Sequence, residues 1–438
     1  MKPTLLALII FGMSISLSAQ LYFPPNNTNT WATTDPSSLG WCQYKVDSLY
    51  RFLEANGTKA FILLKDGKIV LEKYLNGHSP TSNWYWASAG KSLTATLVGI
   101  AQQENYLNIS DPTSKYLEKG WTSCPAIQED KINIRHQLTM TSGLDDGVGD
   151  PFCTLKSCLI YKADAGTRWA YHNGPYTLLD GVIEKATGKN LNLYNNQKIK
   201  TITGMDGLFI YQDYNNVFFS TARSMARFGL LILNKGNWNG TPVLSDQQYY
   251  QDMTNPSQSI NESYGYLWWL NGKNSYMVPG AQIKIPGSLH PSAPKDMFSA
   301  LGKNGQFINV IPSQNMVWIR MGENPDSALV PFLYNDDIWK YINDLSCVSS
   351  SSKDQSDSIK LAFHIYPNPA TDYLKIEKIN GIHKTTMCEI RDHLGRLLSL
   401  QELNENPFHI NTNHLTCGLY FLVLHRDHKT YSYRFIKE

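Results

Sequence analysis

Apolar side chains recur along the first 345 residues in patterns that predict both strands and helices. Residues 60–75 (AFILLKDGKIVLEKYL) carry two apolar runs on either side of Asp66-Gly67, which is typical of a β-hairpin. After residues 84–86 (WYW), apolar side chains follow one another at helical spacing, at Leu93, Leu97, Ile100 and Ala101. These patterns predict a mixed α and β domain in which a helix begins near Ser88.

The pattern changes at residues 346–360 (SCVSSSSKDQSDSIK), which are rich in serine and almost without apolar side chains. Such a stretch is typical of a linker. We therefore expect a large domain at residues 20–345 and a small C-terminal domain at residues 361–438.

The C-terminal domain is expected to be all-β. Residues 363–376 (FHIYPNPATDYLKI) place a Pro-Asn-Pro turn between two apolar runs, and residues 418–424 (GLYFLVL) and 431–436 (YSYRFI) predict a closing hairpin. Seven of the 11 histidines lie here: His364, His383, His393, His409, His414, His425 and His428. Their spacing does not match that of metal ligands, so solvated strand faces are favoured and a metal site is the alternative.

The same domain resembles the sorting domain of the Bacteroidetes type IX secretion system. The resemblance is carried by the segments YPNPATDYLKIE and GLYFLVL and by the C-terminal RFIKE. It implies an export signal that binds the type IX machinery at the outer membrane, is often removed and has no chemistry of its own. A carbohydrate-binding or fibronectin-like β-module is the alternative.

Residues 1–19 predict a secretory signal peptide. Lys2 supplies the positive charge, residues 5–11 form the apolar segment, and Leu17-Ser18-Ala19 offers a cleavage point. A signal anchor is the alternative, and no later apolar run reaches the length that a membrane span needs. We therefore expect a protein that is secreted or held at the cell surface, without a stable membrane span.

Composition narrows the choice of partners. The chain of 438 residues is 42% apolar, enough for a well-packed core, and its 39 basic and 37 acidic residues leave a net charge of +2. This balance gives no electrostatic reason to expect nucleic acid as a partner.

Seven cysteines agree with an oxidising compartment. Spacing suggests the pairs Cys153–Cys158, Cys42–Cys347 and Cys388–Cys417, with Cys124 left over, but it leaves other connectivities open.

The candidate nucleophile is Ser88, which precedes Lys91 by three residues at the predicted helix start. A helix N-terminus stabilises developing negative charge, and a lysine one turn on, packed among apolar residues, can accept the serine proton. The S-x-x-K pattern recurs at Ser350 in the linker and at Ser292 between prolines that exclude a regular helix. An ordinary N-cap serine is the alternative for Ser88.

Two further motifs follow in order. Tyr171-His172-Asn173 lies between a Gly-Thr-Arg-Trp turn and a predicted apolar helix. Because Y-x-N is common in this chain, these flanking segments, and not the tripeptide itself, support the assignment of the motif. Lys303-Asn304-Gly305 precedes a predicted strand, and a simple turn is the alternative.

Together these motifs resemble the serine β-lactamase and penicillin-binding-protein superfamily, whose class A members carry S-x-x-K, S-D-N and K-T-G. With tyrosine in the second motif, the chain is closer to the branch of class C β-lactamases, D,D-peptidases, esterases and 6-aminohexanoate-dimer hydrolases. The segments IRHQLTMTSGLDD and YGYLWW agree, and the resemblance spans about residues 40–345.

The resemblance implies a role for each motif residue. Ser88 is the nucleophile that forms an acyl-enzyme, and Lys91 and Tyr171 act as general base and acid. The implied substrate-binding and oxyanion residues are Asn173, Lys303, Asn304, Gly305 and Gln306. Lys303 would favour the Tyr171 phenolate, and the backbone N–H groups of Ser88 and Gln306 would form the oxyanion hole. No metal or organic cofactor is implied.

Three features bear on the substrate and the site. The third motif reads K-N-G, so it lacks the threonine hydroxyl of penicillin-recognising members, and the Gly-Gln that follows is more like the esterases and oligoamide hydrolases. The aromatic residues of YGYLWW (264–269) either wall a substrate cleft or, as favoured, belong to the core. His172, in the variable position of its motif, is a weaker candidate base.

We therefore expect an α/β (α+β) domain, with an antiparallel sheet, helices on one face and a helical subdomain that holds Tyr171, followed by a small β-sandwich. The favoured function is a secreted serine hydrolase that acts on an ester or amide of a small molecule or peptide. A D,D-carboxypeptidase or β-lactamase, and a non-catalytic module that binds wall peptides, remain open. Retention of Ser88, Lys91, Tyr171 and Lys303 argues against the last of these.

Overall fold

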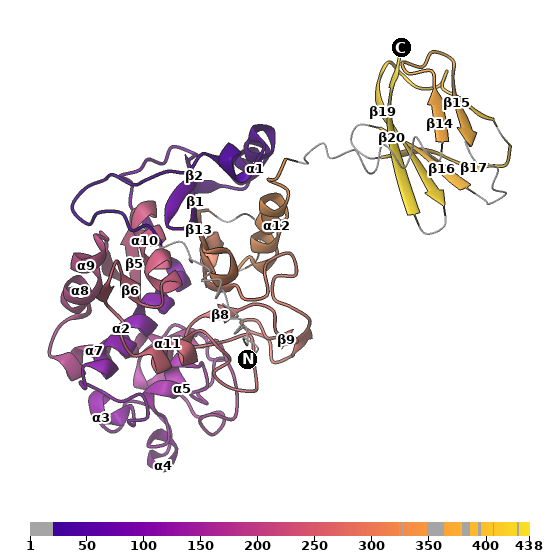
Figure 1. Cartoon of the computed structure of the whole chain (residues 1–438). Helices are drawn as coiled ribbons and strands as arrows, with labels where there is room; N and C mark the ends of the chain where they lie inside the picture. Colours follow the sequence, from indigo (N-terminus) through magenta and orange to yellow (C-terminus); the bar gives the residue numbers. More distant parts are fainter. Residues whose placement is uncertain are drawn as a thin grey trace, which may run out of the picture. The chain divides into compact units, whose positions relative to one another are not determined.

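The structure is a computed structural model that forms two compact units, Met1–Ser346 and Cys347–Glu438 (Figure 1). It describes residues 21–323, 325, 328, 330–347, 363–378, 386–392, 396–405, 407–426 and 429–438. The predicted signal peptide and most of the predicted linker lie outside the described residues.

The large unit is built on a six-stranded antiparallel sheet in the order β2-β1-β13-β12-β11-β8. The strands are β1 (Thr58–Lys65), β2 (Lys68–Tyr74), β8 (Trp269–Leu270), β11 (Phe298–Gly302), β12 (Gln306–Ile311) and β13 (Met316–Gly322). The predicted first hairpin is confirmed, since Lys65 pairs with Lys68 across the two-residue turn. Asp66 and Gly67 both have positive φ, which a two-residue turn of the I′ type requires.

Helices cover both faces of this sheet, whereas we expected them on one face. Helix α10 (Ala222–Leu233) lies against β1, β12 and β13, while α1 (Gln43–Ala55) and α12 (Phe332–Asn343) lie on the other face. Successive residues of β13 show the two faces: Val317 packs against Gly229 of α10, and Trp318 contacts Trp339 of α12. Because every residue of β12 and β13 is buried, a single helical layer would leave apolar side chains in water.

The remaining helices and short strands form the subdomain beside the sheet. The helices are α2 (Lys91–Gln103), α3 (Ser114–Leu117), α4 (Ala126–Glu129), α5 (Ile134–Leu138), α6 (Asn173–Thr177), α7 (Leu179–Thr187), α8 (Leu191–Asn195), α9 (Thr201–Thr203) and α11 (Gln247–Met253). The strands are β3 (Trp84–Tyr85), β4 (Leu208–Gln212), β5 (Asn215–Ser220), β6 (Asn237–Trp238), β7 (Thr241–Pro242), β9 (Ser275–Tyr276) and β10 (Ile285–Pro286). Helix α2 is buried on all sides over its first eleven residues, so it forms the centre of the unit.

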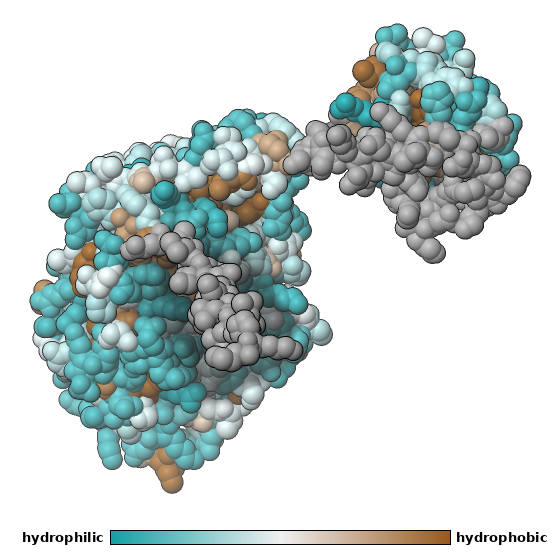
Figure 2. Space-filling model, viewed as in Figure 1, coloured by the Kyte–Doolittle hydropathy of each residue, from teal (hydrophilic) through white to brown (hydrophobic). Residues whose placement is uncertain are grey.

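Apolar side chains are concentrated inside the large unit. The aromatic residues of YGYLWW are all buried, Tyr264, Tyr266, Trp268 and Trp269, so the core interpretation is confirmed. The face seen in Figure 2 is mostly hydrophilic, with scattered apolar residues.

Within the described parts of the chain, every helix is too short or too polar to span a bilayer.

The C-terminal unit contains two antiparallel sheets that share one apolar core, as predicted. The first sheet has the order β14-β15-β18 and the second β17-β16-β19-β20. The strands are β14 (Phe363–Tyr366), β15 (Tyr373–Lys378), β16 (Thr386–Asp392), β17 (Leu397–Leu403), β18 (Phe408–Asn411), β19 (Gly418–Arg426) and β20 (Lys429–Lys437). The predicted closing hairpin is β19–β20. His383, His393 and His428 lie outside the described residues.

The cysteines agree with the predicted pairs in part. Cys153 and Cys158 form a disulfide, and Cys42 and Cys347 are both disulfide-bonded. The predicted Cys388–Cys417 pair is wrong, because both side chains are free thiols. Cys388 points into the sandwich core from β16, whereas Cys417 is exposed in the turn before β19, so the two thiols occupy different environments.

Gly229 tests the contact between α10 and the sheet. A Cβ atom there would lie 2.5 Å from Val317 Cγ1 and 3.1 Å from Ile308 Cγ2. We expect Gly229→Val to lower the free energy of unfolding by about 1–3 kcal/mol through overpacking, since valine is no worse than glycine as a helix former. All 11 tryptophans lie before residue 340, so tryptophan fluorescence in urea reports on the large unit alone.

Gly149→Val is the matched control, because nothing lies within 4 Å of the position of its Cβ atom. Equal stability of the two variants would contradict the close packing of α10 on β13.

Candidate active site

Ser88 lies in a 3₁₀ turn (Ala87–Gly90) that runs directly into α2. Trp86 directly precedes this turn and anchors it, because the indole is fully buried and donates its N–H to Ser220 Oγ at 2.8 Å. Ala87 takes a positive φ of 46°, a strained conformation that turns the chain from β3 into the helix. Ser88 is therefore presented at a helix N-terminus by a fixed backbone, as predicted from the sequence.

Strand β11 passes close to this turn at Gly302. A Cβ atom on Gly302 would lie 2.6 Å from Trp86 O and 3.1 Å from Ser88 N. Only glycine allows the strand to approach the backbone of the nucleophile so closely. This contact joins the central sheet to the helical subdomain at Ser88.

Lys91 donates a hydrogen bond from Nζ to Ser88 Oγ at 2.9 Å. Its side chain is 4% exposed, and Nζ lies 4.3 Å from the ring centroid of Tyr176 and 5.2 Å from that of Tyr171. Burial lowers the pKa of Lys91 to about 7, an effect that the nearby Asp180 carboxylate opposes. An amine with this pKa can accept a proton from the serine near neutral pH.

Tyr171 is brought to Ser88 by the chain that enters α6. Its ring stacks on Trp269, with centroids 5.6 Å apart and planes 22° apart, and it is 7% exposed. Burial raises the pKa of Tyr171 above its usual range, and a hydrogen bond with Ser88 only partly opposes the rise. The resting side chain is thus a neutral phenol, not the phenolate expected beside Lys303.

The third motif forms the tight turn between β11 and β12, which was the alternative in the sequence analysis. Asn304 adopts a left-handed conformation with φ of 62°, and Gly302 pairs with Gln306 across the turn. Asn304 Nδ2 donates to the Tyr85 hydroxyl at 2.7 Å, while Lys303 is exposed at the cavity edge. The motif therefore reaches the cavity from a turn, where Lys303 places a cation at the cavity edge and Tyr85 holds the side-chain amide of Asn304.

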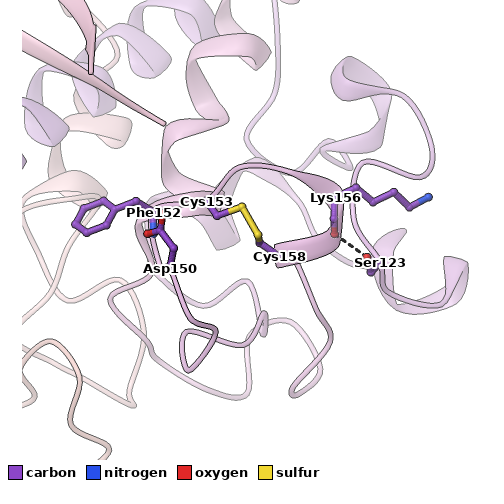
Figure 3. Close-up of a disulfide and its surroundings, with 6 residues drawn as sticks. All are labelled: Ser123, Asp150, Phe152, Cys153, Lys156 and Cys158. Atoms are coloured by element: carbon purple, nitrogen blue, oxygen red, sulfur yellow. Dashed lines mark hydrogen bonds between the residues drawn. A yellow bond between two sulfur atoms is a disulfide. The ribbon is translucent and has the colours of Figure 1, made fainter. Parts of the chain in front are cut away.

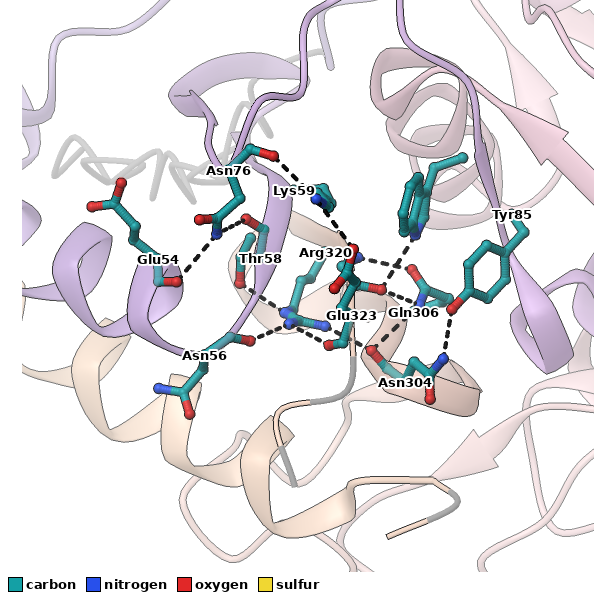
Figure 4. A network of polar contacts seen from close by, with 12 residues as sticks. Glu54, Asn56, Thr58, Lys59, Asn76, Tyr85, Asn304, Gln306, Arg320 and Glu323 are labelled. Carbon is teal, nitrogen blue, oxygen red and sulfur yellow. Dashed lines mark hydrogen bonds and ion pairs between the residues drawn. The ribbon is translucent and has the colours of Figure 1, made fainter. Parts of the chain in front are cut away.

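A buried arginine holds this turn in place (Figure 4). Arg320 is fully buried on β13 and donates to the carbonyl oxygens of Asn304 at 3.0 Å and Gly305 at 2.8 Å. It also donates to Asn56 O and Thr58 Oγ1, so one side chain joins the motif turn to the end of α1 and the start of β1.

Gln306 is directed into this network and away from the cavity. Its side-chain amide donates to Gly322 O at 2.7 Å and accepts from Gly322 N at 3.0 Å. Its side chain is thus structural, and the oxyanion role that the resemblance implies for its backbone N–H stays a prediction.

The motif residues line one cavity of about 390 Å³. Ser88, Lys91, Tyr171, Asn173, Lys303 and Asn304 all contribute to its wall. Ala87, directly before Ser88, also lines it, and the residues that complete the wall were not predicted from the sequence: Tyr85, Phe152, Tyr176, Gln212, Asn215, Asn216, Val217 and Val330. These residues come from separate loops and strands without a motif, so no local signal marks them. A larger hollow of about 850 Å³ contains none of the motif residues.

The Cys153–Cys158 disulfide supports one wall of the cavity (Figure 3). Phe152, which lines the cavity, directly precedes Cys153, and its N–H donates to Asp150 Oδ1 at 2.9 Å. The loop packs on the start of α6, where a Cβ atom on Gly174 would lie 2.4 Å from Cys153 O. The covalent loop thus places Phe152 beside the helix that follows Tyr171.

The competing candidates lie elsewhere. Ser292 Oγ donates to Asp336 Oδ2 at 2.9 Å, away from the cavity, and Ser350 lies outside the described residues. His172 is 2% exposed and does not line the cavity; burial lowers its pKa to about 4. A neutral, enclosed imidazole at this position does not reach a substrate.

The two units match different family models. Residues 53–327 match the family model described as Beta-lactamase, and residues 364–438 match the one described as Secretion system C-terminal sorting domain. The 6-aminohexanoate-dimer hydrolase of Paenarthrobacter ureafaciens is 24% identical over 280 residues, which cover 55% of this chain and 71% of that protein.

Two solved structures share the fold. A protein of Bacillus anthracis, provisionally named a 6-aminohexanoate-dimer hydrolase, superposes with a TM-score of 0.55 at 20% identity, over 74% of this chain and 91% of that one. A family VIII carboxylesterase superposes with a TM-score of 0.51 at 13% identity, over 70% of this chain and 99% of that one. The fold is therefore common to proteins with different activities.

Arg320→Lys tests the anchor of the third motif. Lysine keeps the charge but has three donors on one atom, against five across the planar guanidinium, so some of the buried carbonyl oxygens lose their donors. We expect the free energy of unfolding to fall by about 2–4 kcal/mol, measured by tryptophan fluorescence in urea. Arg51→Lys, at an exposed arginine that donates to Ser48, should leave stability unchanged. A similar change in both variants would refute the anchoring role.

Proposed function

Because the chain belongs to the beta-lactamase family, we propose that it is a secreted serine hydrolase that cleaves esters or small amides through an acyl-enzyme on Ser88. The observation that carries this proposal is the 2.9 Å hydrogen bond between Lys91 Nζ and Ser88 Oγ inside a cavity that Tyr171 also lines. A nucleophile, a base with a lowered pKa and an acid converge there.

In the acylation step, Ser88 Oγ bonds to the carbonyl carbon of the substrate while its proton passes to Lys91. The bond to the leaving group then breaks, and the departing oxygen or nitrogen takes up a proton from Tyr171, which Lys91 replaces. The N–H of Ser88, with Gln306 N–H as the predicted second donor, stabilises the oxyanion. Water then attacks the acyl-enzyme, releases the acid and restores the serine hydroxyl.

The cavity favours a small and uncharged acyl group. Its volume of about 390 Å³ is at the low end of ligand sites, and its lining combines aromatic rings with neutral amides such as Gln212 and Asn215. Asn304 is tied to Tyr85 and offers no free hydroxyl for a carboxylate, unlike the threonine of penicillin-recognising proteins. An ester or a small linear amide therefore fits better than a β-lactam.

A D,D-carboxypeptidase or β-lactamase is the second candidate, and Lys303 is the observation in its favour. This exposed cation at the cavity edge could attract the terminal carboxylate of a wall peptide. A third candidate, a silent module that binds wall peptides, has no use for an amine with a lowered pKa beside the serine.

The C-terminal sorting domain indicates export through a secretion system, and in Bacteroidetes this is the type IX system. We propose that residues 1–19 direct the chain to the periplasm and that the sorting domain then takes it to the outer membrane. The hydrolase unit would act at the cell surface or beyond it, on a substrate from outside the cell.

A substrate panel distinguishes these functions. We expect the protein to hydrolyse short-chain p-nitrophenyl esters, with nitrocefin and a D-Ala-D-Ala peptide untouched, and we expect Ser88→Ala to lower ester kcat/KM by at least about 10³-fold. Ser292→Ala is the control, because it alters the other S-x-x-K serine of the large domain. Rapid nitrocefin cleavage would favour the second candidate, and absence of both turnover and fluorophosphonate labelling would favour the third.

The pH profile of ester hydrolysis tests Lys91 as the base. Its lowered pKa of about 7 means that the amine is protonated below this pH and cannot accept the Ser88 proton. We expect kcat/KM to fall as the pH drops from about 8 to about 6, with a midpoint near the Lys91 pKa. Lys91→Arg, which stays protonated, should be inactive throughout; an active arginine variant would exclude Lys91 as the base.

A further inference from the structure

Phe152 lines the active-site cavity, and the mechanism above gives it no role. Among the described residues of the wall, it is the largest side chain without a polar atom, and Ala87, Val217 and Val330 are the smaller ones. A ring in the wall of a cavity of about 390 Å³ offers contact to an apolar part of a substrate and occupies space that a longer chain would need. Phe152 can therefore both favour a short acyl chain and exclude a long one.

The backbone on either side of Phe152 is fixed to the start of α6. Gly174 N donates to Pro151 O at 2.9 Å, and a Cβ atom on Gly174 would lie 2.4 Å from Cys153 O. Only glycine allows the loop to lie so close to the helix. The N–H groups of Phe152 and Cys153 both donate to Asp150, at 2.9 and 3.2 Å. The backbone at residue 152 is thus held by the helix and by its own turn.

The Cys153–Cys158 disulfide extends this anchorage to the far end of the loop (Figure 3). A neighbouring segment holds that end, because Ser123 Oγ donates to Lys156 O at 2.6 Å and Ser123 N donates to Leu159 O at 2.9 Å. In Figure 3 the ring of Phe152 points away from the disulfide. The covalent loop therefore fixes the backbone on one side of Phe152, while the ring contributes to the cavity wall on the other.

We propose that Phe152 is a specificity-determining residue that limits the length of the acyl chain, and that the Cys153–Cys158 disulfide keeps its ring in the cavity wall. The proposal rests on the proposed function, because the chain in question belongs to the ester or amide that Ser88 would cleave. A butyryl chain would pack against the ring, whereas an octanoyl chain needs the space that the ring occupies. Loss of the ring, or of the bond that fixes it, opens this part of the cavity.

Phe152→Ala removes the ring and keeps the disulfide. We compare p-nitrophenyl butyrate with p-nitrophenyl octanoate, which share a leaving group. We expect the wild type to prefer butyrate, and the variant to raise the octanoate-to-butyrate ratio of kcat/KM by at least about tenfold. Because both activities are measured on one preparation, partial unfolding leaves this ratio unchanged.

Leu155→Ala is the matched control. Leu155 lies in the same loop, is 55% exposed and is not among the described residues that line the cavity. An unchanged ratio in Phe152→Ala, or an equal rise in Leu155→Ala, would overturn the proposal.

The role of the disulfide is tested by combining Cys153→Ser with Cys158→Ser. We expect the same ratio to rise by at least about threefold, and we expect no further rise when both changes are added to Phe152→Ala, because the ring that the bond positions is then absent. Serine at Cys42 and Cys347 is the control, since both are disulfide-bonded and neither lines the cavity. An unchanged ratio, an equal rise in the control, or the same rise in the Phe152→Ala background would refute the role of the bond.

A binding measurement separates this proposal from the proposed function. In the Ser88→Ala background, where no acyl-enzyme can form, we expect octanamide to raise the Tm more with alanine at position 152 than with phenylalanine, and butyramide to show no such gain. If the wild type hydrolyses no ester or amide, the proposed function fails, while this comparison still decides whether Phe152 limits the chain. An equal rise in Tm with octanamide in the two proteins would overturn the proposal.

Discussion

The site depends on the burial of one amine. Lys91 is nearly inaccessible to water, lies against two aromatic rings and donates to Ser88, so its charged form has lost most of its solvation. That loss lowers its pKa to about 7, and a lysine in water would keep the proton and be of no use as a base. Everything that encloses the amine, from the buried helix α2 to the stack of Tyr171 on Trp269, therefore serves the chemistry as well as the core.

The enclosure is assembled from two parts of the domain. The helical subdomain supplies Ser88, Lys91 and Tyr171, while the sheet supplies the turn of the third motif and the glycine that meets the backbone of Ser88. Arg320 holds the sheet side rigid through carbonyl oxygens from two segments, the turn of the third motif and the end of α1. The cavity lies where these parts meet, so its shape depends on both, which agrees with ligand sites being found at such junctions.

Sequence reasoning succeeded where neighbours along the chain determine the structure. The hairpin at Asp66-Gly67 and the helix after Ser88 follow from turn chemistry and apolar spacing, and both are present. It failed where the structure of a segment depends on other segments, far away in the sequence, that pack against it. The second helical layer on the sheet, the free thiol of Cys388 in the sandwich core and the neutral state of Tyr171 are examples, since burial by distant segments decides each of them.

The amino-acid sequence alone determined the order of the motifs, the division into a large and a small unit, and the pairing of the proposed nucleophile with its lysine. These are local properties, because Ser88 and Lys91 lie one helical turn apart whatever the rest of the chain does. Only the tertiary structure decided which other residues share their cavity and what charge each group carries. Tyr85, Phe152 and Asn216 have no motif, and they line the same cavity as Ser88 and Lys91 because the packing of segments far apart in the sequence brings them there.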